Sequence, residues 1–74
     1  PMQEPNITVF GASWCPDCRR SKQFLGEQRI PFVWVDIDQD EEGRTRAQEV
    51  NGGKQIIPTI VFQDGSILVE PSNA

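Results

Sequence analysis

The chain has 74 residues, 36% of them apolar, and a net charge of −4 at pH 7. A chain this short forms one domain at most, so we expect a single domain over residues 1–74 with one small core. No apolar stretch approaches the ~20 residues that cross a bilayer, and the acidic balance provides no basic stripe for phosphates. Neither a membrane nor nucleic acid is therefore an expected partner.

The amino-terminal residues 1–5 have neither a basic flank nor an apolar run. No signal peptide is expected, and the cytoplasm is the predicted location. Pro1 precedes a methionine, as a processing remnant would.

The first predicted element is a buried strand over residues 7–10, because β-branched and aromatic side chains run up to Gly11. A loop over residues 12–15 follows it. Pro16 stands where a helix would begin, at a position where its missing N–H loses no hydrogen bond. We expect this helix to end at Gln28, shortly before the next proline.

One face of this helix is predicted to join the core. The residues on or beside that face are Cys18, Ser21, Phe24 and Leu25. The predicted core residues with no functional role are Phe24, Leu25, Trp34 and Phe62.

Residues 32–37 are predicted to form a second strand that is covered on both faces, because the run is almost continuously apolar. Two strands joined by a helix pair in parallel, with a right-handed crossover. Asp38 followed by Glu41 resembles a capping box, so a second helix is expected through about Val50. Residues 51–53, which read Asn-Gly-Gly and tolerate positive φ, should close that helix.

Acidic side chains gather where the second helix begins. They are Asp36, Asp38, Asp40, Glu41 and Glu42. A cation site is one interpretation, but a helix start is favoured because acids there complement the helix dipole and calcium-loop spacing is absent. No metal site is predicted.

Residues 59–62 and 66–69 are predicted to form an antiparallel hairpin, because the Asp64-Gly65 pair between them is a strong turn signal. The predicted order is strand, helix, strand, helix, strand, strand. This order indicates an α/β fold with a four-stranded mixed sheet.

The two cysteines, Cys15 and Cys18, are three residues apart across the first strand-to-helix junction. Unpaired N–H groups and the positive end of the helix dipole favour a thiolate at such a junction. Cys15 gains this most directly and is predicted to be the attacking nucleophile. Cys18, one turn into the helix and facing the body of the protein, is predicted to resolve the mixed disulfide.

The cysteine pair has three other interpretations besides redox chemistry. Zinc needs four ligands, and with no histidine and two cysteines this chain would have to share the ion with a second molecule. A structural disulfide would close a loop too short to restrict the unfolded chain much. The third interpretation is a pair of buried, inert cysteines. Pro16 and the loop before it argue against burial, so redox chemistry is favoured.

Two side chains near the cysteines are candidates for the site. Trp14 lies in the loop and is predicted to form an exposed wall of the site rather than cover for the core. If the helix turns Lys22 toward Cys15, its ammonium would stabilise the thiolate or hold a substrate carboxylate. Arg19 and Arg20 either take part in the site or form a solvated helix face, and the sequence favours neither interpretation.

Pro58 begins a predicted strand, where its missing N–H does little harm. The local pattern does not decide whether the Ile57–Pro58 bond is cis, since only ~5–6% of such bonds are.

With these parts assembled, residues 6–73 resemble the glutaredoxin branch of the thioredoxin superfamily, which implies a thioredoxin-like fold. Residues 15–18 are similar to the Cys-Pro-x-Cys signature, and residues 57–59 to a segment whose proline is cis. In that family the backbone before the cis proline pairs with the cysteine part of the bound thiol. The predicted substrate-binding residues are Trp14, Pro16, Lys22, Ile57 and Pro58.

The closest likeness, over residues 50–60 and 62–66, is to the mycoredoxins and related short bacterial glutaredoxins, which use mycothiol. Glutathione-using members carry Gly-Gly and acids after the last strand, where residues 68–72 here read Leu-Val-Glu-Pro-Ser. The resemblance implies no bound cofactor and a small thiol, mycothiol or glutathione, as co-substrate. Family members continue into a further helix, and residues 72–74 resemble its N-cap, so we expect that helix to be missing here.

The resemblance implies a monomeric thiol–disulfide oxidoreductase that acts on disulfide-bearing proteins and mixed disulfides, with a flavin-dependent disulfide reductase upstream. One alternative is a redoxin that is reduced by thioredoxin reductase and serves ribonucleotide reductase. The other is a carrier whose iron–sulfur centre is shared by two chains. Single-thiol relatives favour the carrier role, so the presence of Cys18 argues against it.

Overall fold

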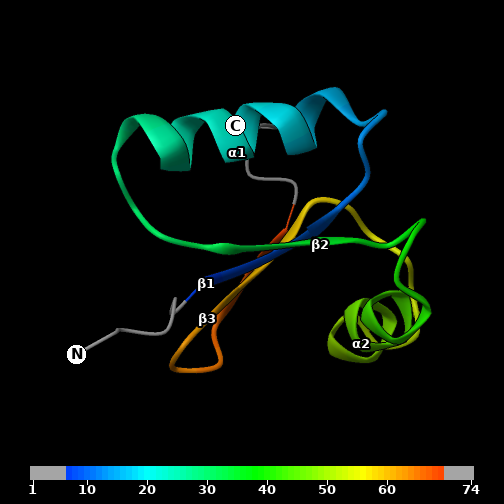
Figure 1. Cartoon of the computed structure of the whole chain (residues 1–74). Coiled ribbons are helices and arrows are strands. Elements are labelled where there is room, and N and C mark those ends of the chain that lie inside the picture. Colours follow the sequence, from blue (N-terminus) through cyan, green and yellow to red (C-terminus); the bar gives the residue numbers. More distant parts are fainter. Residues whose placement is uncertain (1–6, 70–74) are drawn as a thin grey trace.

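The computed structural model describes residues 7–69, which form one sheet with a helix on each side (Figure 1). The elements are β1 (Ile7–Gly11), α1 (Pro16–Glu27), β2 (Val33–Asp36), α2 (Glu41–Val50), β3 (Thr59–Phe62) and β4 (Ile67–Val69). The predicted order is confirmed. The expected helix start at residues 72–74, and the part of residues 68–72 beyond Val69, lie outside the described residues.

The strands are arranged in the order β2-β1-β3-β4. β1 pairs in parallel with β2, so that Val9 lies opposite Trp34, and antiparallel with β3, so that Val9 also lies opposite Ile60. β3 and β4 form the predicted antiparallel hairpin. The mixed four-stranded sheet is therefore confirmed, and β1 and β3 are its inner strands.

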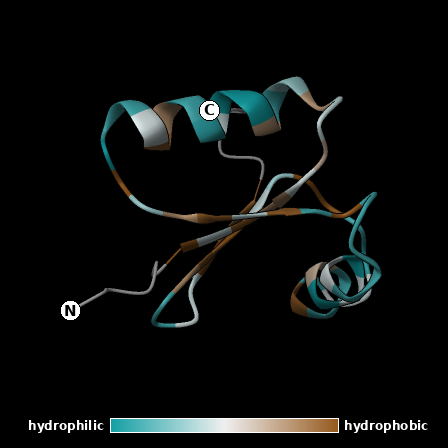
Figure 2. Cartoon of the chain, viewed as in Figure 1, coloured by the Kyte–Doolittle hydropathy of each residue, from teal (hydrophilic) through white to brown (hydrophobic). Residues whose placement is uncertain are grey.

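Successive residues of a strand point to opposite faces of the sheet, and this alternation divides the core into two layers. The buried residues on the α1 side are Val9, Leu25 and Ile60, and those on the α2 side are Phe10, Ile37 and Ala47. Figure 2 shows the apolar strands between helices whose outer surfaces are polar. Burial of apolar surface on both faces is the main force that holds this fold together.

Two predictions about burial are wrong. Val33 in β2 is 42% exposed, because β2 is an edge strand and is not covered on both faces along its length. Phe24 is 57% exposed, because it is rotated by one residue from the buried Leu25 and borders an open apolar groove. Trp34 and Phe62 are partly buried against the core, as expected.

α2 begins two residues later than the proposed capping box implied. The N-cap is Asp40, whose carboxylate accepts the N–H of Gly43 at 2.9 Å, so the prediction of Asp38 as the cap is wrong. A cap needs only the backbone N–H of the third helical residue, and Gly43 supplies it without a glutamate. Gly43 also lets α2 approach β2, since a Cβ there would lie 2.3 Å from Cγ1 of Val35.

α1 ends in a Schellman motif. The N–H of Arg29 donates to the carbonyl of Gly26, and the N–H of Ile30 donates to that of Leu25. Arg29 has φ of 58°, in the left-handed region that glycine ordinarily occupies at this position. Ile30 packs against the cluster that contains Leu25, which directs the chain back toward β2.

No helix within residues 7–69 combines the length and apolar character that a membrane span requires.

Candidate active site

The site begins where β1 ends. After Gly11 the chain turns, and the N–H of Cys15 donates to the carbonyl of Ala12 at 3.2 Å. Cys15 is the N-cap of α1, with extended backbone angles, and Pro16 occupies the first helical position as predicted. The carbonyl of Cys15 accepts the N–H of Arg19 at 3.1 Å, which is the first hydrogen bond of the helix.

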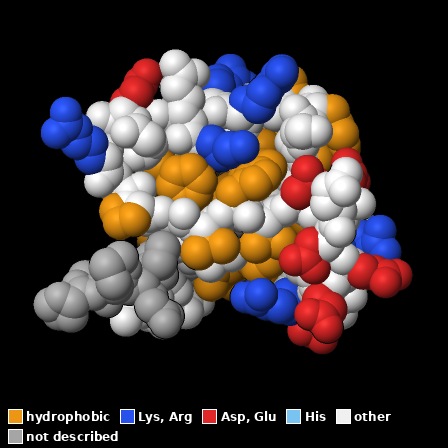
Figure 3. All heavy atoms as spheres, in the orientation of Figure 1, with side chains coloured by type: hydrophobic (Ala, Val, Ile, Leu, Met, Phe, Trp, Pro, Cys, Tyr) orange, Lys and Arg blue, Asp and Glu red, His pale blue; other side chains and the backbone are white. Residues whose placement is uncertain are grey.

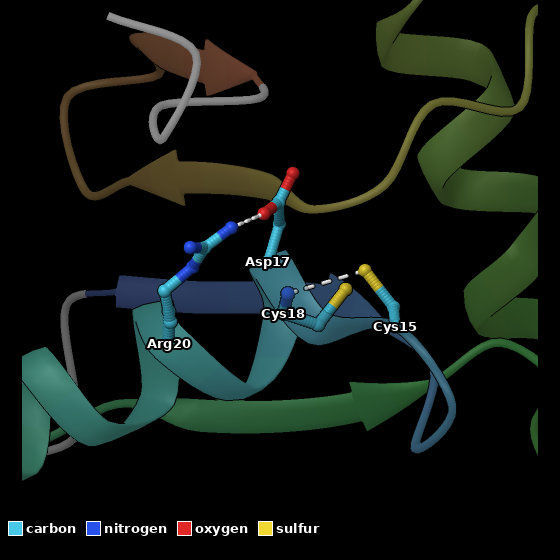
Figure 4. A network of polar contacts seen from close by, with 4 residues as sticks. All are labelled: Cys15, Asp17, Cys18 and Arg20. Carbon is cyan, nitrogen blue, oxygen red and sulfur yellow. Dashed lines mark hydrogen bonds and ion pairs between the residues drawn. The ribbon is translucent and has the colours of Figure 1, made fainter.

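The Cys15 sulfur acts as the capping group. The N–H of Cys18 donates to Sγ of Cys15 at 3.1 Å, in the way a serine or aspartate oxygen accepts at other helix starts. Figure 4 shows the two sulfur atoms on the same side of the helix start. The sulfur of Cys15 therefore takes the place of a capping oxygen at the start of α1.

Both cysteines are buried, and both are free thiols. Cys18 is fully buried and Cys15 is 6% exposed, so the expectation that the loop would keep Cys15 from burial is wrong. The loop residues Ser13 and Trp14 are exposed, but the Cys15 side chain turns inward and packs in one cluster with Ala12 and Cys18. The position of Cys18 toward the body of the protein is confirmed.

The two thiols differ in acidity because of their surroundings. Burial, followed by the hydrogen bond with Cys15, raises the pKa of Cys18 from an ordinary value of 9.0 to about 12. The charges of Cys15 and Asp17 act in the same direction, and a backbone hydrogen bond with Ala12 opposes them. Cys18 is therefore a neutral thiol near pH 7 while Cys15 is free.

Gly11 and Trp34 pack closely against the cysteines. A Cβ at Gly11 would lie 2.6 Å from Sγ of Cys18 and 2.7 Å from Cη2 of Trp34, so the close approach requires glycine. Trp34 packs against the cysteine cluster from β2. The sequence marked Gly11 only as the end of a strand and Trp34 only as a core residue.

Lys22 packs on Trp34, the residue that lies beneath the cysteines. Its Nζ lies 4.0 Å from the centroid of the Trp34 ring, in cation–π geometry. The structure therefore places Lys22 against a residue that packs on the cysteine cluster.

Trp14 is 63% exposed, so it does not cover the core. Its Nε1–H donates to the carboxylate of Asp38 at 2.7 Å. In addition, the N–H of Ile37 donates to the carbonyl of Gly11 at 2.9 Å. The loop before Cys15 is thus joined at two points to the segment between β2 and α2. The sequence pattern had predicted Asp38 as the N-cap of α2 instead.

The second predicted constellation lies beside the first. The Ile57–Pro58 bond is cis, as the resemblance implied, and Pro58 is buried. Ile57 is partly buried and packs against the cluster that contains Cys15 and Cys18. The structure thus brings Ile57 to the cysteines from the start of β3.

Two polar side chains near Ile57 were not singled out from sequence. The amide of Asn51 donates to the hydroxyl of Thr59 at 3.0 Å, and this hydroxyl donates to the carbonyl of Ile56 at 2.5 Å. Nothing in the local pattern distinguishes this asparagine from an ordinary helix-closing residue. Thr59 is fully buried, so its contacts are shielded from water.

The two helices differ in their balance of charge. In Figure 3 basic side chains gather mainly where α1 lies, and acidic ones gather where α2 lies, with some basic side chains among them. Asp17 and Arg20 form an ion pair on α1 that extends away from the two sulfur atoms (Figure 4). Within residues 7–69, no three cysteine or acidic side chains are placed to hold a metal ion.

The glutaredoxin family model matches residues 7–67, a span that includes the whole cysteine site and the cis proline. The chain belongs to the glutaredoxin family. This membership agrees with the thioredoxin-like arrangement of the sheet and with the cysteine pair at the start of α1.

Individual relatives of this glutaredoxin-family chain support the same conclusion. A Mycobacterium tuberculosis protein assigned to the glutaredoxins is 39% identical over 89% of the chain and 79% of its own length. Mycoredoxin 1 of Corynebacterium glutamicum is 36% identical over 89% of the chain and 81% of its own length.

Solved structures confirm the thioredoxin-like fold. A thioredoxin-like protein superposes with a TM-score of 0.75 at 27% identity, over 85% of this chain and 84% of that one. The glutaredoxin of Archaeoglobus fulgidus superposes with a TM-score of 0.74 over 88% of this chain and 74% of that one. At 24% identity the latter likeness supports the fold alone.

Proposed function

We propose that this protein is a thiol–disulfide oxidoreductase that reduces disulfides, and mixed disulfides between proteins and small thiols, through Cys15 and Cys18. The observation that carries the proposal is the hydrogen bond from the Cys18 N–H to Sγ of Cys15 at the start of α1. We propose that the sulfur in this capping position is the nucleophile, and a second thiol lies one turn away.

In the first step the Cys15 thiolate attacks one sulfur of the substrate disulfide. A bond forms between Cys15 and that sulfur, the substrate S–S bond breaks, and the second sulfur leaves as a thiolate that takes up a proton from solvent. Ile57, beside the cysteines, is proposed to pair its backbone with the substrate, and Trp14, Pro16 and Pro58 to border it.

In the second step the Cys18 thiol gives up its proton and attacks Cys15, which releases the reduced substrate thiol and leaves the Cys15–Cys18 disulfide. The substrate gains two electrons and the protein loses two. Once Cys15 is in a mixed disulfide, its thiolate charge no longer raises the pKa of Cys18, so forming the intermediate helps Cys18 to ionise. A small thiol can replace Cys18 in this step.

The small thiol is proposed to be mycothiol or glutathione. The 36% identity with Mycoredoxin 1 of Corynebacterium glutamicum supports mycothiol. A flavin-dependent disulfide reductase is proposed as the upstream electron source, and a monomer in the cytoplasm as the working form. The exposed Trp14 gives a partner protein access to the loop before Cys15.

The experiment is the reduction of a peptide–mycothiol or peptide–glutathione mixed disulfide by the reduced protein and its Cys15→Ser and Cys18→Ser variants. We expect Cys15→Ser to abolish turnover. Cys18→Ser should retain turnover when the small thiol is in excess, and mass spectrometry should show that thiol attached at Cys15. Full activity of Cys15→Ser would overturn the proposal.

Donor assays separate the proposed function from its main rival. Reduction of the oxidised protein by a small thiol with its reductase, and not by thioredoxin reductase, is the expected result. Preferential reduction by thioredoxin reductase would favour the redoxin alternative. Visible absorbance after anaerobic purification would favour the iron–sulfur carrier.

A further inference from the structure

A continuous hydrogen-bond chain runs from the end of α2 to the peptide before the cis proline. Both protons of the Asn51 side-chain amide are used, one on the carbonyl of Ala47 at 2.8 Å and one on Oγ1 of Thr59 at 3.0 Å. The Thr59 hydroxyl proton is donated to the carbonyl of Ile56 at 2.5 Å. The chain therefore contains three hydrogen bonds and joins α2 to the segment that leads into β3.

The chemistry of the groups fixes the direction of this chain. The carbonyls of Ala47 and Ile56 can only accept, so Asn51 must present its NH₂ group to the first and Thr59 its O–H to the second. The Thr59 oxygen is then an acceptor for Asn51. Hydrogen bonds aligned donor to acceptor in this way polarise and strengthen one another, and Thr59 is fully buried.

The carbonyl at the end of the chain belongs to the same planar unit as the N–H of Ile57. In a trans peptide the C=O and N–H groups point in opposite directions, so the bond from Thr59 also sets the direction of the Ile57 N–H. Within the described residues, no hydrogen bond engages the N–H or the carbonyl of Ile57. Ile57 packs against the cluster that contains the cysteines, so these two groups lie beside it.

We propose that Asn51 and Thr59 are positioning residues that hold the Ile56–Ile57 peptide in the orientation needed to pair with the peptide groups of a substrate cysteine. This inference rests on the proposed function, because it assumes that Ile57 pairs with substrate. It assigns to the two side chains a role in selecting cysteine-containing disulfides, separate from the sulfur exchange at Cys15.

The test compares two disulfides that differ in their peptide groups. One is the disulfide of an acetylated, amidated cysteine, and the other is bis(2-hydroxyethyl) disulfide, which has no peptide group. Oxidation of the pre-reduced protein is followed in stopped flow, and the second-order rate constants give a ratio of peptide to hydroxyethyl substrate. The variants are Thr59→Val, which has the same shape but no hydroxyl, and Thr59→Ser, which keeps the hydroxyl.

For Thr59→Val we expect the rate ratio to fall roughly 3- to 10-fold, the loss typical of one neutral hydrogen bond. Thr59→Ser should keep the wild-type ratio. Asn51→Asp should lower it as Thr59→Val does, because a carboxylate would face the Ala47 carbonyl with no proton to donate. The backbone amide resonance of Ile57 should shift in Thr59→Val and Asn51→Asp, and not in Thr59→Ser.

A purely structural role predicts a different outcome. Both rate constants would then fall together in Thr59→Val while the ratio stayed unchanged, and this result would overturn the inference. If Thr59→Val does not fold, Asn51→Asp at the partly exposed end of α2 decides the question by the same ratio. If neither disulfide oxidises the wild-type protein, the proposed function fails instead, so the two failures are distinguishable.

Discussion

The backbone N–H of Cys18 lies 3.1 Å from Sγ of Cys15 and donates a hydrogen bond to it. This contact contributes to the protonation behaviour of Cys18. Burial, together with the hydrogen bond and the charge of Cys15, raises the pKa of Cys18 to about 12. Cys18 is therefore protonated near neutral pH.

This coupling predicts a selective pattern of alkylation. With iodoacetamide at pH 7 to 9, the reduced protein should take up one group, at Cys15, because Cys18 is protonated and fully buried. Peptide mapping by mass spectrometry locates the label. The unfolded protein is the control and should be labelled at both positions.

Removal of Cys15 should make Cys18 more acidic. In a Cys15→Ala variant the hydrogen bond and the charge of Cys15 are absent, so the pKa of Cys18 should fall below about 12, although burial still holds it above 9.0. The ultraviolet absorbance of the thiolate, followed against pH, measures the change. An unchanged midpoint would show that burial alone sets the acidity of Cys18.

The same raised pKa makes the stability of the reduced protein depend on pH. Above pH 9 the thiol of Cys18 ionises in the unfolded chain but not in the folded one, so the unfolded state binds fewer protons there. This contribution to the free energy of unfolding is complete below pH 9 and is lost as the pH rises to about 12. Urea unfolding across this range should show a decline that Cys18→Ala reduces.

Gly11 should be sensitive to the addition of a single methyl group. Gly11→Ala would place a Cβ 2.6 Å from Sγ of Cys18, and overpacking of this kind destabilises by about 1–3 kcal/mol. The matched control is Gly26→Ala in α1, where a Cβ would meet nothing within 4 Å. That variant should gain about 0.5–1 kcal/mol from helix propensity, and thermal unfolding checks both.

Arg29 offers the opposite test, a substitution that should stabilise. It has a positive φ at the end of α1, where a side chain adds strain. Arg29→Gly should therefore raise the free energy of unfolding by roughly 0.5–1 kcal/mol, whereas Arg29→Ala keeps the Cβ and should change it little. Equal effects of the two substitutions in chemical unfolding would contradict this explanation.

Much of the fold could be predicted from sequence because its signals are local. Pro16 at the start of α1 and Gly65 in the hairpin, with φ of 90°, both take the conformations that their residue types favour. The spacing of Cys15 and Cys18 across a strand-to-helix junction likewise indicated where the cysteine site would form. Each of these features depends on residues within a few positions of one another.

The failed predictions concern contacts between distant segments. Asp38 has the residue type of an N-cap, but Trp14 of the cysteine loop donates a hydrogen bond to it, and Asp40 caps α2 instead. The exposure of Phe24 depends on which elements pack beside α1. No pattern along the chain encodes these pairings.

The cysteine loop leaves the sheet at Gly11, the last residue of β1, and Pro58 leads into β3. Both segments of the site are therefore anchored on the two strands that have neighbours on each side. β4, whose three residues are all exposed, can fray without disturbing either anchor. Amide hydrogen exchange should be fast in β4 and slow in β1, and the geometry around the sulfur atoms should persist while the margin of the sheet opens and closes.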